Sequence, residues 1–131
     1  MRKNVLFLVG LLAMAACATV EPVWRTIPES EYPYKKAWPI IVSTISNKFD
    51  IATIDANSGY MRTDWKIKKD MFGTPKTRTR MAVKTESKQP LKFSFRAEVE
   101  SWNAFSESWT PKGNDATIES DIQEEFASRL K

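Results

Sequence analysis

Residues 91–100 alternate apolar and polar side chains without a break, and no other feature of the sequence constrains the fold as tightly. The apolar positions of this segment are Leu91, Phe93, Phe95, Ala97 and Val99. Alternation of this kind is typical of a β-strand that turns one face to a hydrophobic core and the other to water. Because such a strand needs neighbours and a covering layer, the segment predicts a sheet with other elements packed on one side.

Three earlier segments carry a weaker form of the same pattern, at residues 50–56, 60–67 and 77–86. In the second of these we expect the odd-numbered residues from Met61 to Ile67 to share one face. Asn57-Ser58-Gly59 separates the first two segments and is a turn signal. Together with residues 91–100, these segments predict an antiparallel meander of four strands.

Two other segments space their apolar residues for helices. They repeat every fourth residue, the first through Ala37, Ile41, Ile45 and Phe49 and the second through Ile118, Ile122, Phe126 and Leu130. Ser30 is expected to cap the first helix, and Asp115 or Thr117 the second. Pro39 requires either a kink or a regular helix that begins near Trp38.

The predicted order of elements is therefore α-β-β-β-β-α, with residues 101–116 as a long loop before the last helix. This order predicts an α+β fold: an antiparallel four-stranded meander sheet with two helices packed on one face. A chain of 131 residues, 42% of them hydrophobic, suits one small domain of this kind.

The N-terminus indicates an export signal. Arg2 and Lys3 precede an apolar run from Val5 to Ala16, which is shorter than the roughly 20 residues of a membrane-spanning helix. Met14-Ala15-Ala16-Cys17 then resembles a bacterial lipobox, which implies lipidation of Cys17, the only cysteine, and cleavage just before it. Ala18, in place of aspartate, implies sorting to the outer membrane. The alternative is an ordinary secretory signal with an incidental cysteine.

The expected organisation has three parts: a lipoprotein signal peptide at 1–16, the lipidated cysteine and a tether at 17–30, and a single domain at 31–131. An extended tether with two prolines could hold the domain about 40 Å from the membrane. Val23, Trp24 and Ile27 are apolar for a free tether. This segment is therefore expected either to pack along the domain as an edge strand or to bind a partner.

Several motifs also resemble the helix-grip domain of BamC-like lipoproteins, which belong to the outer-membrane β-barrel assembly machine. The motifs are Ala37-Trp38, the turn from Asp55 to Gly59, and Thr63-Asp64-Trp65, and the resemblance covers roughly residues 35–105. It implies a helix-grip fold and an accessory role in an envelope complex. BamC has two such domains and a long N-terminal segment that holds its partner, whereas this chain has one domain and a short tether.

The sequence offers little catalytic chemistry. It contains no histidine and no glycine-rich phosphate loop, so we expect no enzyme, no cofactor and no metal site. The carboxylate pairs Glu98/Glu100 and Glu119/Asp121, like Asp64, are expected on solvated faces. The net charge of +4 falls to +2 without Arg2 and Lys3 of the expected signal, and a charge this close to zero argues against nucleic acid as a partner of an exported protein.

Two surfaces are candidates for binding. The first is basic with apolar residues at a loop tip, suits an anionic membrane surface, and comprises Lys66, Lys68, Lys69, Phe72, Arg78 and Arg80. Its alternative is a plain solvated strand face. The second is aromatic, suits a protein partner, and comprises Trp102, Phe105 and Trp109. Its alternative is that one or two of these rings complete the core.

Taken together, these features predict a non-catalytic binding module, lipid-anchored at the outer membrane and facing the periplasm. We expect it to contact the membrane through its lipid and to serve an envelope protein partner as an accessory subunit. The alternative is a small lipid- or ligand-binding lipoprotein with a cavity between helices and sheet, lined by Trp65, Phe93, Phe95 and Ile41. An envelope hydrolase is disfavoured because no nucleophile motif is present.

Overall fold

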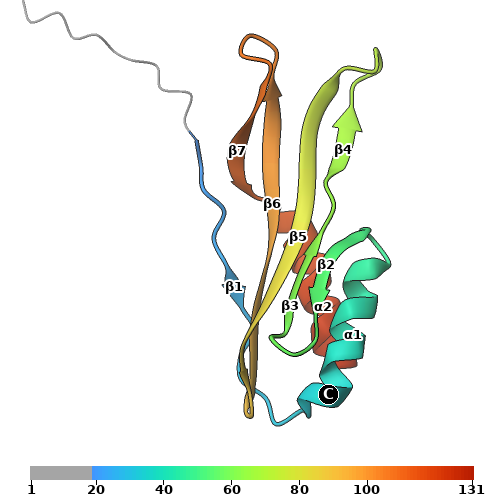
Figure 1. The fold of residues 1–131 in the computed structure, drawn as a ribbon, viewed down its shortest axis with the longest axis vertical. Helices are drawn as coiled ribbons and strands as arrows, with labels where there is room; N and C mark the ends of the chain where they lie inside the picture. Colours follow the sequence, from blue (N-terminus) through green and yellow to red (C-terminus); the bar gives the residue numbers. More distant parts are fainter. Residues whose placement is uncertain (1–18) are drawn as a thin grey trace, which may run out of the picture.

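A computed structural model describes residues 19–131 as an antiparallel sheet with two helices (Figure 1). The elements in chain order are β1 (Arg25–Thr26), α1 (Tyr34–Ser46), β2 (Ile51–Asp55), β3 (Tyr60–Thr63), β4 (Lys66–Lys69), β5 (Pro75–Lys88), β6 (Leu91–Asn103), β7 (Ser108–Asn114) and α2 (Ala116–Arg129). The predicted α+β class, with an antiparallel sheet and two helices, is confirmed.

The prediction of four strands is wrong, because the sheet has seven. Its order is β1-β6-β5-β3-β2, with β4 added beside β5 and β7 beside β6. The long strands β5 and β6 pair over almost their whole length, from Thr77↔Ser101 to Lys88↔Leu91. They form the spine of the sheet, and the shorter strands add to its two sides in pieces.

One extra strand arises because the predicted strand 60–67 is interrupted. β3 pairs with β5 at Met61↔Val83, and β4 pairs with it further along, at Lys66↔Thr79. Asp64 lies between them, outside any strand, and its backbone N–H donates to Asp50. The break shifts the alternation by one residue, so the expected shared face of residues 61–67 does not form.

A second extra strand replaces part of the predicted loop 101–116, which is wrong in its second half. Ser108–Asn114 turns back on β6 with Trp102↔Trp109 as a paired position. The turn is closed by the side-chain oxygen of Asn103, which accepts from the backbone N–H of Phe105 at 2.9 Å. Glu107 adopts a φ of 49° in the left-handed region. The loop is therefore a β-hairpin with a tight end.

Only one of the two helices has the N-terminal cap that the sequence predicted. Helix α1 starts after Pro33 without a side-chain cap, so the expected cap by Ser30 is wrong, and the helix continues through Pro39. Ser30 instead forms a β-bridge with Leu91. At α2, the Asp115 carboxylate accepts from the backbone N–H of Ile118 at 3.0 Å, as predicted.

The core lies between the two helices and one face of β5 and β6. Phe126 of α2 packs edge-to-face on two strand residues, with ring centroids 5.2 Å from Phe93 and 5.5 Å from Phe95. The helical stripes predicted from the sequence supply much of the rest, and Ile41, Ile45 and Ile122 are fully buried. The helices lie along one half of the sheet, and hairpins β4–β5 and β6–β7 project beyond them (Figure 1).

Residues 20–30 are packed on the sheet and do not form a free tether. Val20 pairs with Lys112 near the end of β7, and Arg25 pairs with Phe95 of β6. The Ile27 backbone N–H then donates to Phe93 at 2.9 Å. This segment is thus the edge-strand form of the two possibilities that the sequence left open. The predicted 40 Å separation would need these hydrogen bonds to be broken.

Candidate functional site

The face of the sheet opposite the helices carries a row of stacked cations and aromatic rings. The guanidinium carbons of Arg78 and Arg80 lie 4.2 and 4.3 Å from the ring centroid of Trp65. Arg78 also lies 4.5 Å from the ring centroid of Trp109. Arg78 of β5 therefore contacts two aromatic rings, that of Trp65 just before β4 and that of Trp109 in β7. Such cation–π contacts stiffen the projecting part of the sheet.

Carboxylates of β6 neutralise this row. Arg78 pairs with Glu100 at 2.5 Å, and Arg80 pairs with Glu98 at 2.7 Å, each directly across from its partner in the sheet. Arg96 pairs with the second oxygen of Glu98, also at 2.7 Å. Only 6% of Glu98 is exposed, so its predicted solvated position is wrong. Because three arginines share these two glutamates, most of the positive charge that they would present to an anionic surface is compensated.

The structure therefore does not unite the six residues predicted as one basic surface. Arg78 and Arg80 lie on the face away from the helices. Lys66 and Lys68 of β4 lie on the helix side, across from Thr79 and Thr77 of β5. Lys69 and Phe72 lie at the β4–β5 turn, both exposed. The physical reason is the break after β3, which reverses the faces of β4 relative to the predicted alternation.

The three predicted aromatic residues are brought together in one hairpin with different exposures. Trp102 and Trp109 face each other across β6 and β7, with ring centroids 5.2 Å apart in an edge-to-face arrangement. Both are half-buried, and neither belongs to the core cluster. Phe105 lies at the turn and is fully exposed. The rings therefore build a stiff hairpin with a bare aromatic tip, and do not complete the core.

Helix α2 provides a buried polar contact that the sequence pattern did not indicate. Glu119 is 3% exposed, and one of its oxygens accepts from the Ala97 backbone N–H at 3.1 Å and from the Asn114 amide at 2.8 Å. Its predicted place on a solvated face is wrong, whereas Asp121 is exposed. Glu119 stands seven positions before Phe126 on the same helix face, and this spacing was the available signal.

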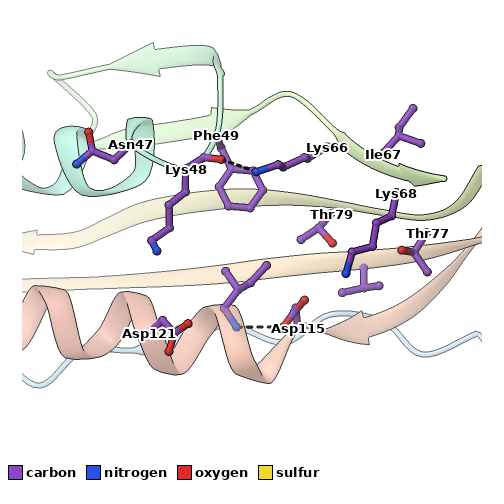
Figure 2. A pocket seen from close by; sticks show the side chains of 12 residues that line it. Asn47, Lys48, Phe49, Lys66, Ile67, Lys68, Thr77, Thr79, Asp115 and Asp121 are labelled. Carbon is purple, nitrogen blue, oxygen red and sulfur yellow. Dashed lines mark hydrogen bonds between the residues drawn. The ribbon is translucent and has the colours of Figure 1, made fainter. Parts of the chain in front are cut away.

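A cleft of about 640 Å³ opens on the helix side, where the projecting strands leave the helices (Figure 2). Lys66 lies along one wall of the cleft: its ammonium donates to the Lys48 backbone oxygen at 3.2 Å and lies 5.5 Å from the Phe49 ring centroid. Asp115 and Asp121 of the opposite wall come from the α2 region. Because the cleft is open and its walls carry both signs of charge, it does not select one charge of ligand.

The cavity considered for a lipid- or ligand-binding protein does not form from its predicted residues. Ile41, Phe93 and Phe95 are fully buried in the core. Trp65 lies on the other face, against the two arginines of β5. A side chain on the far face of the sheet cannot line a cavity beneath the helices.

The β2–β3 turn contains the clearest electrostatic shift. The pKa of the Asp55 carboxyl is lowered by the Ser58 hydroxyl and by backbone hydrogen bonds from Asn57 and Ser58. The pKa of Tyr34 is raised by burial of its hydroxyl and by the nearby charge of Asp55. The Tyr34 hydroxyl donates to the Ala56 backbone oxygen. This turn is closed by internal hydrogen bonds, which indicates a structural role.

No protein-family model matches this chain, and none of the curated proteins does either. Cys17 lies outside the described residues. Between residues 19 and 131, no helix is long and apolar enough to cross a membrane. The same stretch holds no group of three or more acidic, cysteine or histidine side chains placed to bind a metal.

Proposed function

We propose that this protein is a non-catalytic, lipid-anchored binding module of the bacterial cell envelope. In this proposal Cys17 carries the lipid, the chain sits at the outer membrane facing the periplasm, and it serves an envelope complex as an accessory subunit. The resemblance to BamC-like domains is consistent with such a role. The observation that carries the proposal is the β6–β7 hairpin with the fully exposed Phe105 at its tip.

The hairpin has the properties of a protein-binding element. A phenylalanine that is left in water costs the protein solubility, and exposed aromatic side chains are frequent anchors in interfaces. Behind it, the Trp102–Trp109 pair and the stacked Arg78 hold the two strands together. A tip that is already ordered loses little conformational entropy when a partner binds it.

The packed N-terminal segment bears on where such a partner would lie if Cys17 carries a lipid. Because Val20 is hydrogen-bonded to β7, with its backbone N–H donating to Pro111 at 3.1 Å, only the residues before it separate the domain from Cys17. Three residues span at most about 10 Å. A lipid at Cys17 would therefore hold β7 close to the bilayer surface. The partner is then expected to be a membrane protein or one bound to the membrane.

Site-specific photo-crosslinking in living cells tests this proposal. A photoreactive amino acid at position 105 is expected to give one discrete crosslinked product, because the partner covers the tip. The matched control is the same reagent at Thr53 of β2, which is also exposed but lies beside α1, away from the hairpin tips. The Phe105→Ser variant is expected to fold normally and to lose the partner in a pull-down from gently solubilised membranes.

Two results would refute the proposal. Equal crosslinking at positions 105 and 53 would mean that the hairpin tip is not a specific contact. A mature protein whose mass lacks the acyl chains would remove the anchor, whatever the crosslinking shows.

A further inference from the structure

The second projecting hairpin, β4–β5, also ends in exposed apolar side chains. At its turn, Met71 is 90% exposed and Phe72 is 86% exposed. They are adjacent in the sequence and lie at the end of the molecule that is remote from the core (Figure 1). Neither side chain contributes to the core cluster. Large apolar residues that lie together in water at a projecting end mark a site that is covered in use.

The turn forms several of its backbone hydrogen bonds internally, which lowers the cost of bringing it into the headgroup region of a bilayer. The Asp70 carboxylate accepts from the backbone N–H of Phe72 at 2.9 Å and of Thr74 at 3.0 Å. The Asp70 N–H donates to the Thr74 backbone oxygen at 2.9 Å, and the Gly73 N–H donates to the Asp70 backbone oxygen at 3.1 Å. Buried polar groups are costly only when they lack such partners. The one acidic side chain of this turn is therefore held inside it.

The charges around the turn are positive and unpaired by acids. Lys68, Lys69 and Lys76 are exposed, and within residues 19–131 none of them makes a salt bridge. The arginines further down β5 are both held by glutamates. By contrast, residues 101–111 at the end of the β6–β7 hairpin contain no lysine or arginine and include Glu107. The two tips thus differ in the kind of surface that they fit.

We propose that the β4–β5 turn is a second membrane contact, in which Met71 and Phe72 enter the headgroup region of an anionic bilayer while Lys68, Lys69 and Lys76 contact the lipid phosphates. An apolar tip surrounded by cations matches such a surface in both hydrophobicity and charge. A protein partner would need acidic side chains placed opposite these three lysines, whereas an anionic lipid surface supplies negative charge everywhere. The contact deepens the proposed function, because it fixes the orientation of a domain that one lipid attachment would leave free to rotate.

The geometry of the chain permits both contacts at once. Val20 is held against β7, so the described residues before β1 lie on the side of the sheet beside the β6–β7 hairpin (Figure 1). Hairpins β4–β5 and β6–β7 project from the same end of the molecule. A bilayer that holds the lipid at Cys17 can therefore also meet the β4–β5 turn. The β6–β7 hairpin then lies beside this contact at the same end of the molecule, where it can meet a partner in or on the membrane.

Depth-dependent fluorescence quenching tests the proposal with the mature protein as purified from membranes. The variant Phe72→Trp adds an indole at the turn, and Thr53→Trp adds one at an exposed control position on β2. Each is reconstituted into vesicles that contain brominated phosphatidylcholine, either alone or in equal mixture with phosphatidylglycerol. The fluorescence of the unaltered chain is subtracted in every case. We expect the indole at position 72 to be quenched in the anionic vesicles and the control indole to stay unquenched.

The lysines supply a second readout on the same variant. Lys68→Gln/Lys69→Gln in the Phe72→Trp background should lower the ratio of inserted to free turns about 30-fold, from about 1 kcal/mol per cation at the surface. High salt should have the same direction of effect. Unchanged quenching after loss of both charges would overturn the role of the lysines.

The remaining outcomes separate this proposal from the proposed function. Position 72 behaving like position 53 in anionic vesicles would overturn the membrane contact. Quenching of a Phe105→Trp variant without quenching at position 72 would overturn it too, since the other hairpin would then touch the bilayer. If the purified protein carries no lipid but still binds anionic vesicles with position 72 quenched, the anchor is refuted and the turn contact is supported.

Discussion

Replacing Glu119 by alanine is expected to be the most damaging single change of a charged residue in this protein. On the side of β6 that faces away from β5, β1 pairs with β6 at Phe95 and β7 pairs with it from Glu98 onward. Ala97 lies in the gap between these two pairings. Neither neighbour provides an acceptor for the Ala97 N–H, and the carboxylate of Glu119 fills that gap. The substitution leaves this N–H buried without an acceptor.

The magnitude follows from the interactions that the substitution removes. A buried donor without a partner costs about 1–3 kcal/mol, and a charge-assisted hydrogen bond, here from Asn114, contributes about 1.5–3 kcal/mol. The ion pair with Arg25, at 3.7 Å and partly exposed, adds at most about 0.5 kcal/mol. We expect Glu119→Ala to reduce the free energy of unfolding by about 3 kcal/mol. Glu119→Gln, which keeps an acceptor oxygen, should cost about 1 kcal/mol.

Urea unfolding measures this difference, with Glu124→Ala, an exposed position of the same helix, as the control. The midpoint should fall by about 2 M for Glu119→Ala and hardly change for the control. The backbone amide of Val23, which donates to Asn114, should also exchange faster with solvent. If Glu119→Ala were no more harmful than Glu124→Ala, the assignment of this carboxylate to the gap in β6 would be wrong.

Two further predictions concern the turns. Gly59→Ala should reduce the free energy of unfolding by more than about 2 kcal/mol, because φ is +68° and the new Cβ would lie 2.2 Å from the Thr85 hydroxyl oxygen. Gly73→Ala, where φ is +79° but the space around the new Cβ is open, should reduce it by only about 1 kcal/mol. Equal losses of the two variants in urea unfolding would contradict the steric argument. Because the pKa of Asp55 is lowered in the folded protein, its carboxylate should stabilise the fold above pH 3.8, the pKa in the unfolded chain, and this stabilisation should be lost as the pH falls through the folded pKa. The variant Asp55→Asn should not show this loss. Identical acid-unfolding curves of the two proteins would refute the prediction.

The sequence pattern succeeded where one residue type repeats along one element. The alternation of residues 91–100 and the stripe through Ile118 and Phe126 both identify side chains that lie in the core or pack against it. It failed at β7, because residues 108–114 contain a proline, a lysine and a glycine and show no alternation. That segment is extended because β6 pairs with it, and the hydrophobic periodicity of a segment does not show which strand it will pair with.

The candidate surfaces divide in the same way. The sequence identified Trp102, Phe105 and Trp109 as a group, and proximity along the chain keeps them in one hairpin. It could not show that Arg78 meets Glu100, because a slip of one residue between β5 and β6 would place Val99 opposite it instead. The sequence also predicted a solvated Glu119. The gap that this residue fills is formed by three separate strands, so no local pattern could show that its carboxylate is buried.

Local sequence patterns were enough to predict the α+β class, the two helices and the inward faces of the long strands, because periodicity and turn residues act within a few positions of each other. The predicted export segment and Cys17, on which the proposed anchoring depends, also rest on the sequence alone. The pairing of cations with carboxylates, the position of residues 20–30 and the apolar residues left at the tips are visible only in the folded chain. These features depend on strand register and on contacts between distant segments, which are fixed only when the whole sheet assembles.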